Sequence, residues 1–187
     1  MGASFNHDYY DERFNPLGPL PKAESKVSKE TTPGLYAQYT YKLGDKLTVM
    51  PGVRWDHSDR YGSFVTPRLH IKYSPSKIVT LRTSIGKGYR SPHALAENVT
   101  LLASGREIVI DPDLKQEEAW NMGASLGFNI PLFGKNLELN AEYYYTDFKH
   151  QMIMNFDGAK GEHTLSFENL DGKSYSHTFQ VDATYAL

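Results

Sequence analysis

Residues 34–56 read GLYAQYTYKLGDKLTVMPGVRWD, and they alternate apolar and polar side chains on both sides of Gly44-Asp45. The apolar set is Leu35, Ala37, Tyr39, Tyr41 and Leu43 before the turn and Leu47, Val49, Val53 and Trp55 after it. A period of two is typical of a strand with one apolar face, and Gly-Asp is a hairpin dipeptide. The stretch therefore predicts a β-hairpin.

The same alternation continues in both directions from this hairpin. It appears around residues 69–73, 79–85, 120–130, 137–145 and 175–185, and more weakly near the start of the chain. No stretch has a convincing helical period. We expect an all-β fold, an antiparallel up-and-down meander of about eight strands with antiparallel pairing throughout.

The lengths of the connections also alternate along the chain. Short turns are expected at 44–45, 74–77 and 131–136, and long loops at 11–33, 56–66, 87–118 and 149–173. Consecutive antiparallel strands place every second connection at the same end, so all long loops gather at one end and all tight turns at the other. This asymmetry is typical of transmembrane β-barrels.

The two faces of the expected sheet differ in chemistry. Burying charged side chains without partners would be costly, and one face of the sheet carries most of them. They are Arg54, Arg68, Lys72, Arg82, Glu138, Glu142 and Asp182. Nothing in the chain supplies a second layer for the apolar face, which lipid would cover. On that face we expect aromatic girdles, with Trp55, Trp120, Tyr143 and Tyr145 near the long-loop end and Tyr41 and Tyr73 near the other.

Composition narrows the function classes further. The chain has 187 residues, a net charge of -2 and no cysteine. The charge gives no basic surface for nucleic acid, and the absence of cysteine excludes thiol catalysis and thiolate metal sites. The seven histidines show no metal-ligand spacing. We expect no catalytic residues, no metal site and no cofactor, and hence no enzyme.

Two motifs flank the third long loop. GKGYRSPHALAE at 86–97 resembles the Phe-Arg-Ala-Pro box of TonB-dependent outer-membrane receptors, with Tyr89-Arg90-Ser91-Pro92 in its place. DPDLKQEEAWNMGASLGF at 111–128 resembles the Asn-Pro-Asp-Leu-Lys-Pro-Glu box of the same family, with Asp111 for the Asn and Gln116 for the second Pro. The hairpin at 34–56 is also similar to hairpins of this family's barrels. The resemblance covers most of the chain.

The resemblance implies a bacterial outer-membrane location and a receptor for active uptake of a scarce ligand, such as an iron chelate, haem, cobalamin or a glycan. It implies outer-membrane lipid, a plug domain inside the barrel and an energy-transducing periplasmic protein as partners. Family barrels have about twenty-two strands. Residues 1–187 are therefore expected to form one partial barrel domain, an internal fragment without the plug and remaining strands, which self-associates when isolated.

Candidate site residues follow from the two boxes. Loop anchoring is expected from Tyr89, Arg90, Pro92, Asp111, Pro112 and Asp113, because Pro92 cannot donate to a strand ladder and Asp suits the turn that re-enters the sheet. Ligand contacts are expected in the external loops, at Arg90, His93, Glu97 and Arg106. Haem receptors of the family carry a histidine between the same boxes, which is why His93 is included.

Two other interpretations remain open at this point. Eight strands can close into a small outer-membrane barrel of structural or passive-pore type, with lumen charges paired. A soluble β-domain of an interaction protein is the third possibility. The ligand is not identified by the sequence.

Overall fold

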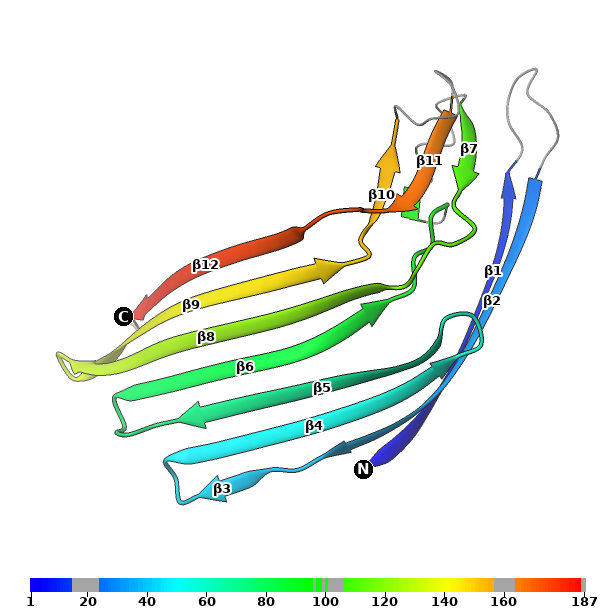
Figure 1. The fold of residues 1–187 in the computed structure, drawn as a ribbon. Coiled ribbons are helices and arrows are strands. Elements are labelled where there is room, and N and C mark those ends of the chain that lie inside the picture. Colours follow the sequence, from blue (N-terminus) through cyan, green and yellow to red (C-terminus); the bar gives the residue numbers. More distant parts are fainter. Residues whose placement is uncertain (15–23, 96, 99, 101–105, 157–163, 186–187) are drawn as a thin grey trace.

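The computed structural model describes residues 1–14, 24–95, 97–98, 100, 106–156 and 164–185. One sheet dominates it, with the strand order β1-β2-β4-β5-β6-β8-β9-β12 and β3 paired to β4. The bounds are β1 Gly2–Phe14, β2 Glu24–Gln38, β3 Tyr41–Leu43, β4 Leu47–Ser58, β5 Gly62–Tyr73, β6 Val79–Arg90, β8 Glu117–Leu132, β9 Lys135–Lys149 and β12 Ser174–Tyr185. Every pair within this sheet is antiparallel, so the predicted meander is confirmed (Figure 1).

The register places the two predicted faces as expected. Directly opposed residues share a face. Leu81 of β6 lies opposite Leu126 of β8, which lies opposite Ala141 of β9. On the other face, Lys72 lies opposite Arg82, and Arg82 lies opposite Ser125. One side of the sheet is therefore continuously apolar and the other polar.

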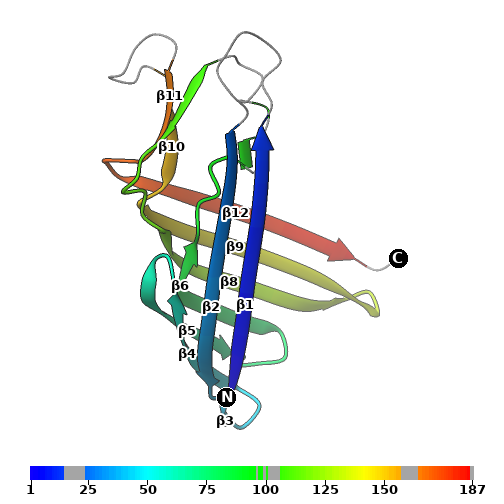
Figure 2. The same cartoon turned by 90° about the vertical axis from the view of Figure 1, so that its right-hand side faces the viewer.

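Within the described part of the chain, no further layer covers either face of the main sheet (Figures 1 and 2). Leu35, Val53, Leu126 and Phe179 are among the exposed large apolar residues, and Phe179 is 72% exposed. Figure 2 shows β1 and β2 in front of β8, β9 and β12, so the sheet bends round instead of lying flat. Among the described residues no helix is long and apolar enough to cross a membrane. A curved, single-layer sheet with one apolar face is the form of a barrel wall.

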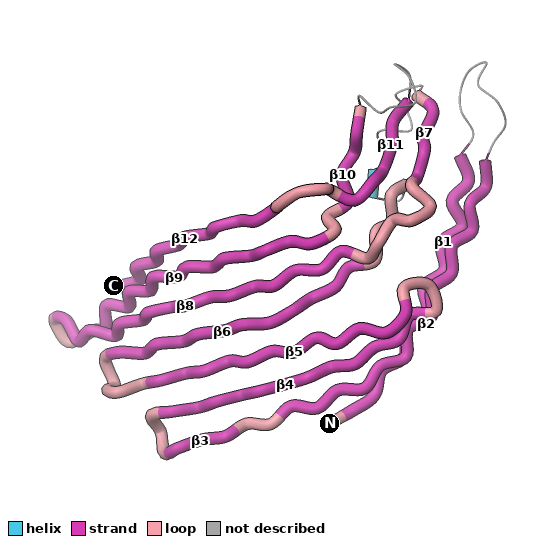
Figure 3. The backbone as a smooth tube through the Cα atoms, viewed as in Figure 1, coloured by secondary structure: helices cyan, strands magenta, loops and turns pink. Residues whose placement is uncertain are grey.

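The turns follow from local chemistry. Phe133 and Gly134 join β8 to β9 with φ of 49° and 80°, the left-handed pair that a two-residue hairpin needs. The gap between β2 and β3 lies opposite Pro51, whose missing N–H interrupts the ladder, while Tyr39 N–H still donates to the Pro51 carbonyl at 3.0 Å. The β8–β9 turn lies at the end of the sheet opposite the long loops (Figure 3), whereas the β2–β3 gap only interrupts the ladder against β4.

Two predicted long loops are wrong in extent. Residues 11–33 were expected to form a loop, but β1 and β2 stay paired up to Phe14 and Glu24, so the loop can occupy only residues 15–23, which lie outside the described residues. Residues 56–66 were expected to form a loop, but β4 and β5 stay paired up to Ser58 and Gly62. Only residues 59–61 form the turn. Ser58 Oγ accepts the N–H groups of Arg60 and Tyr61, both at 3.1 Å, and Gly62 has a φ of 79°. The serine hydroxyl closes the turn in a way that apolar periodicity does not reveal.

The last two long loops form a second, three-stranded sheet. Its strands are β7 Glu107–Ile110, β10 Met152–Asn155 and β11 Thr164–Asn169, in the order β10-β11-β7. β11 pairs parallel to β7, so the prediction of antiparallel pairing throughout is wrong here. The buried hydrophobic residues of the described chain are Ala94, Leu165 and Phe167, and all three belong to this loop unit.

Candidate functional site at the long-loop end

Arg90 joins the bases of the two long loops. Its Nε donates to Glu117 Oε2 at 2.5 Å, and its guanidinium lies 3.2 Å from Glu97. The other Glu117 oxygen accepts the Met152 N–H at 2.7 Å, where β10 begins. The hydrogen bond to Glu117 raises the pKa of Arg90. Arg90 thus contacts β8 through Glu117 and the loop after β6 through Glu97, and Glu117 continues the contact to β10; the anchoring role itself stays a prediction.

A buried polar chain crosses the same end of the sheet. Glu30 of β2 is 5% exposed and accepts the hydroxyls of Ser58 at 2.7 Å and Ser91 at 3.0 Å. Gln116 Nε2 in turn donates to Ser91 Oγ at 3.1 Å. Ser91 and Gln116 are two of the positions at which the motifs depart from the family pattern. The structure brings these two departures into direct contact.

Asp111, Pro112 and Asp113 form the turn that leads back towards β8. Asp111 Oδ1 accepts the Asp113 N–H at 2.9 Å, and the Asp111 carbonyl accepts the Leu114 N–H at 3.2 Å. The Asp111 N–H donates to the Phe167 carbonyl at 2.9 Å. The aspartate thus fixes a local turn and connects it to β11.

The wall opens between β5 and β6 near this end. Their ladder stops at Arg68–Gly86, although β5 begins at Gly62 and β6 ends at Arg90. Pro67 follows the last pair towards the loops, and it has no N–H to donate. Beyond it the Phe64 and Tyr89 rings pack at 4.5 Å, and the Lys87 ammonium lies 4.6 Å from the Tyr89 ring centre and 2.7 Å from Glu118. Aromatic contacts replace the ladder here.

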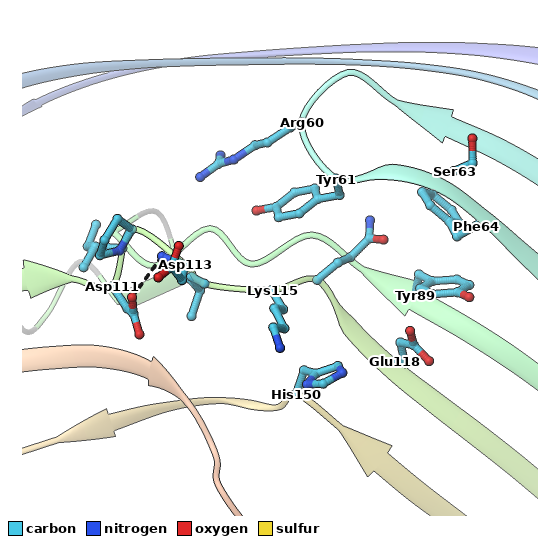
Figure 4. A pocket seen from close by; sticks show the side chains of 14 residues that line it. Arg60, Tyr61, Ser63, Phe64, Tyr89, Asp111, Asp113, Lys115, Glu118 and His150 are labelled. Atoms are coloured by element: carbon cyan, nitrogen blue, oxygen red, sulfur yellow. Dashed lines mark hydrogen bonds between the residues drawn. The ribbon is translucent and has the colours of Figure 1, made fainter.

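A pocket of about 730 Å³ lies beside this opening (Figure 4). The β4–β5 turn contributes Arg60 and Tyr61, the 111–116 turn contributes Lys115, and the end of β9 contributes His150. Its lining consists of Arg60, Tyr61, Ser63, Phe64, Tyr89, Ile110, Asp111, Pro112, Asp113, Leu114, Lys115, Gln116, Glu118 and His150. The size is within the range of small-molecule sites. Burial raises the pKa of the Tyr61 phenol above its ordinary value.

The predicted residues divide between pocket and surroundings. Tyr89, Asp111, Pro112 and Asp113 line the pocket, and Pro92 is buried beneath the loops. The residues predicted to contact a ligand do not line this pocket; they are Arg90, His93, Glu97 and Arg106. His93 packs on the Tyr10 ring at 4.3 Å and Arg106 lies 5.4 Å from the Phe156 ring centre. Their ligand-binding role stays a prediction.

Sequence reasoning missed Arg60, Tyr61, Lys115 and His150. Arg60 and Tyr61 were assigned to a long loop without a role, and Lys115 was noted only as part of a box. His150 has a φ of 54°, a backbone state that a non-glycine residue rarely adopts. No periodic signal marks these positions, because each lies in or next to a turn.

The predicted girdle residues are distributed over the apolar face. Trp55 lies opposite Val65, Tyr143 opposite Ala124 and Phe179, and Tyr73 opposite Leu47 and Leu81. Trp55, Tyr41, Tyr73 and Tyr143 are exposed, and Trp120 and Tyr145 are partly exposed. His177, which the sequence left unassigned, joins this face with Nδ1 2.7 Å from the Tyr143 hydroxyl oxygen. The girdle itself remains a prediction.

In the part of the chain that the structure describes, no group of three or more His, Asp or Glu side chains could hold a metal ion. The ion pairs there involve Arg54–Asp56, Lys87–Glu118 and Arg90 with Glu97 and Glu117. Arg54–Asp56 lies within β4, whereas Lys87–Glu118 and Arg90–Glu117 connect β6 to β8, and Arg90–Glu97 connects β6 to the loop that follows it.

Comparisons of the sequence with a family model and with curated proteins both identify outer-membrane receptors as its relatives. A family model for the TonB-dependent receptor-like β-barrel matches residues 1–187. The ferric enterobactin receptor of Pseudomonas aeruginosa is 29% identical over 89 residues, which is 48% of this chain and 12% of that protein. The iron-regulated outer membrane virulence protein of Vibrio cholerae is 25% identical over 114 residues, 60% of this chain and 17% of that protein.

Solved structures show the same fold. A mutant of the ferric enterobactin receptor PfeA from Pseudomonas aeruginosa has a TM-score of 0.70 at 20% identity, covering 99% of this chain and 30% of that chain. The siderophore receptor PirA from Acinetobacter baumannii has a TM-score of 0.70 at 15% identity, covering 97% and 31%. The chain thus spans less than a third of the solved structures and 12–17% of these two curated relatives.

Proposed function

The chain belongs to the TonB-dependent receptor-like β-barrel family, and on this basis we propose that it forms part of the wall of a receptor that takes up an iron chelate of the siderophore class. Its location is the bacterial outer membrane, and it is a receptor segment rather than an enzyme. Of the three interpretations left open by the sequence, family membership therefore favours the receptor.

The observation that carries the proposal is the pocket at the long-loop end. Arg60 and Lys115 bring cationic groups to it, beside the carboxylates of Asp111, Asp113 and Glu118, the last of which is paired with Lys87. Tyr61, Phe64 and Tyr89 bring aromatic rings (Figure 4). Cations bind the oxygen-rich anionic ligands of a ferric chelate, and aromatic rings pack against its organic framework. Loops at this end would meet a ligand arriving from outside the cell, as external barrel loops do.

The relatives' names favour an iron chelate over haem, cobalamin or a glycan. Two curated relatives are ferric enterobactin receptors, from Pseudomonas aeruginosa and Escherichia coli, and another is an iron-regulated protein. Identities of 25–29% do not transfer one particular chelate. The proposal therefore names the class, a ferric siderophore.

The partners of the whole protein are part of the proposal. The apolar face would contact outer-membrane lipid, and the polar face would surround a plug domain that couples to an energy-transducing periplasmic protein. Arg68, Lys72 and Arg82 on the polar face are exposed, and their side chains have no hydrogen bond or ion pair within the described chain. Such cations would suit acidic groups of a domain inside the barrel.

Uptake of ⁵⁵Fe by iron-limited cells tests this proposal. Cells producing the protein are compared with cells lacking it, using ferric catecholate, hydroxamate and citrate chelates, with haem and cobalamin supplied in parallel. We expect uptake of at least one ferric chelate and of neither haem nor cobalamin. Uptake of haem or cobalamin alone would overturn the ligand class.

Matched variants then test the pocket. Arg60→Ala with Lys115→Ala removes both lining cations, whereas Lys77→Ala with Lys135→Ala removes two exposed lysines at the tight-turn end. Each charge-assisted hydrogen bond contributes about 1.5–3 kcal/mol, so we expect binding weakened at least tenfold by the first pair only. Equal binding by both pairs would move the ligand site away from this pocket.

A further inference from the structure

We propose that Asn169 is a positioning residue that joins the two long loops and holds Lys115 and His150 in the pocket, an inference that rests on the proposed function. Asn169 ends β11, and its side chain bridges two segments that are distant in sequence. Its Oδ1 accepts the Lys115 N–H at 2.7 Å, and its Nδ2 donates to the His150 carbonyl at 2.6 Å and to the Lys115 carbonyl at 3.3 Å. One amide thus fixes the backbone of two pocket residues.

His150 needs this support because its backbone is strained. Its φ of 54° lies in the left-handed region, which costs a residue with a Cβ more than it costs glycine. Strained backbone persists only where surrounding contacts stabilise it. The strain turns the chain from β9 towards β10 and leaves the imidazole in the pocket (Figure 4). The Asn169 hydrogen bond to the His150 carbonyl is the side-chain contact made to His150 itself, and it stabilises this turn together with the bonds to residues 151 and 152.

Asn169 is itself held by the core of the loop unit. Leu165 and Phe167 are 0% and 1% exposed, and Ile108, Ile110 and Met152 pack around them. The Phe167 carbonyl accepts the Asp111 N–H, and the Leu170 N–H donates to the Gln151 carbonyl at 2.8 Å. A displacement of residue 169 therefore reaches residues 111–116 and 150–152 together, so the pocket walls move as one unit.

Hydrogen exchange with mass spectrometry tests the bridge without any ligand. Asn169→Ala removes all three hydrogen bonds, and we expect amide exchange within 111–116 and 150–153 to rise about tenfold. Asn169→Asp keeps the acceptor for Lys115 N–H but loses both donors, so only 150–153 should loosen. Asn121→Ala is the matched control, because it removes an exposed asparagine hydrogen bond, to Thr146, in the main sheet.

A second variant separates strain from lost contacts. His150→Gly tolerates the left-handed backbone, so adding it to Asn169→Ala should restore protection of 150–153 without restoring affinity for the ferric chelate, because the imidazole is gone. Unchanged exchange at 111–116 in Asn169→Ala relative to Asn121→Ala would overturn the inference. A different outcome separates the two proposals. If Asn169→Ala loses protection but the parent protein binds no ferric chelate, the proposed function is overturned and the Asn169 bridge still stands.

Discussion

Replacing Leu126 by Arg tests which face of the sheet contacts lipid. Leu126 lies near the middle of β8, with Leu81 and Ala141 directly opposite on the neighbouring strands. It is 38% exposed on the apolar face. In a membrane the Arg side chain would therefore enter hydrocarbon, with no carboxylate among its directly opposed neighbours.

The cost follows from the depth of this position. Arg on the lipid face of a barrel costs about 2–4 kcal/mol near the bilayer midplane. That range corresponds to a folding equilibrium about 30- to 900-fold less favourable. The matched control is Asn129→Arg, since Asn129 is exposed on the polar face opposite Glu138. Opposite charges in such a cross-strand pair are mildly favourable, by roughly 0.2–1 kcal/mol.

Ser125, the neighbour of Leu126 in β8, is a less suitable control position. Ser125 does lie on the polar face, but it is only 5% exposed, and its hydroxyl is 3.3 Å from Asn140 Oδ1. An Arg there would be overpacked whatever the environment of the face. Asn129 therefore separates the effect of lipid from the effect of crowding.

Denaturant titration of the protein folded into phospholipid vesicles measures the effect, with tryptophan fluorescence as the signal. Trp55 and Trp120 both lie on the apolar face and report insertion. We expect a lower unfolding midpoint for Leu126→Arg and a midpoint close to the parent for Asn129→Arg. Equal midpoints for the two variants would refute the assignment of faces.

Three further predictions follow from the rim and the edges. Arg90→Ala should raise amide exchange near residues 94–98 and 152 while costing only about 0.2–1 kcal/mol of stability, because the Arg90 side chain is 57% exposed; unchanged exchange would argue against its anchoring role. Burial raises the pKa of Tyr61, so the unfolded chain releases the phenol proton at a lower pH than the folded protein, and the free energy of unfolding should fall as pH rises above 10. Thermal unfolding between pH 8 and 11 should show this loss in the parent protein but not in Tyr61→Phe, and identical pH profiles for the two would contradict the prediction. The isolated 187-residue chain should self-associate, because β1 and β12 each pair on one side only within the described sheet; a monomer by light scattering in detergent-free buffer would favour a soluble domain.

The main sheet could be predicted because its signal is periodic. Alternation over residues 34–56 and 120–145 fixed which side chains share a face, and the register agrees with that assignment. A shift of one residue in strand register would move every apolar side chain to the polar face, so the pattern is compatible with only one register. The position of the long loops followed from the same alternation and from strand direction.

The loop unit could not be predicted, because its pairing is not local. β7 and β11 are parallel and about fifty residues apart in the chain, and a short strand in a loop has too few residues to show a period. The 56–66 segment was misjudged for a different reason. Its polar residues suggested a loop, whereas Ser58 uses its hydroxyl to close a tight turn.

The candidate site was predicted in part. Tyr89, Asp111 and Asp113, which the two boxes marked as loop anchors, line the pocket, because each box carries a turn or strand-end residue; their anchoring role stays a prediction. The pocket also depends on Arg60 and His150, which reach it only through the β4–β5 turn and the strained end of β9. Such convergence is a property of the tertiary structure and leaves no motif in the sequence.

Cysteine labelling in intact cells tests the central claim, that the long loops face outward from an outer-membrane barrel. The chain contains no cysteine, so single substitutions give an unambiguous signal within it. Asp171→Cys places an exposed thiol at the long-loop end, and Lys77→Cys places one in the tight turn between β5 and β6. With a membrane-impermeant maleimide, the account predicts labelling of Asp171→Cys in intact cells and of Lys77→Cys only after the outer membrane is disrupted. Equal labelling of both in intact cells, or labelling of Lys77→Cys alone, would contradict it.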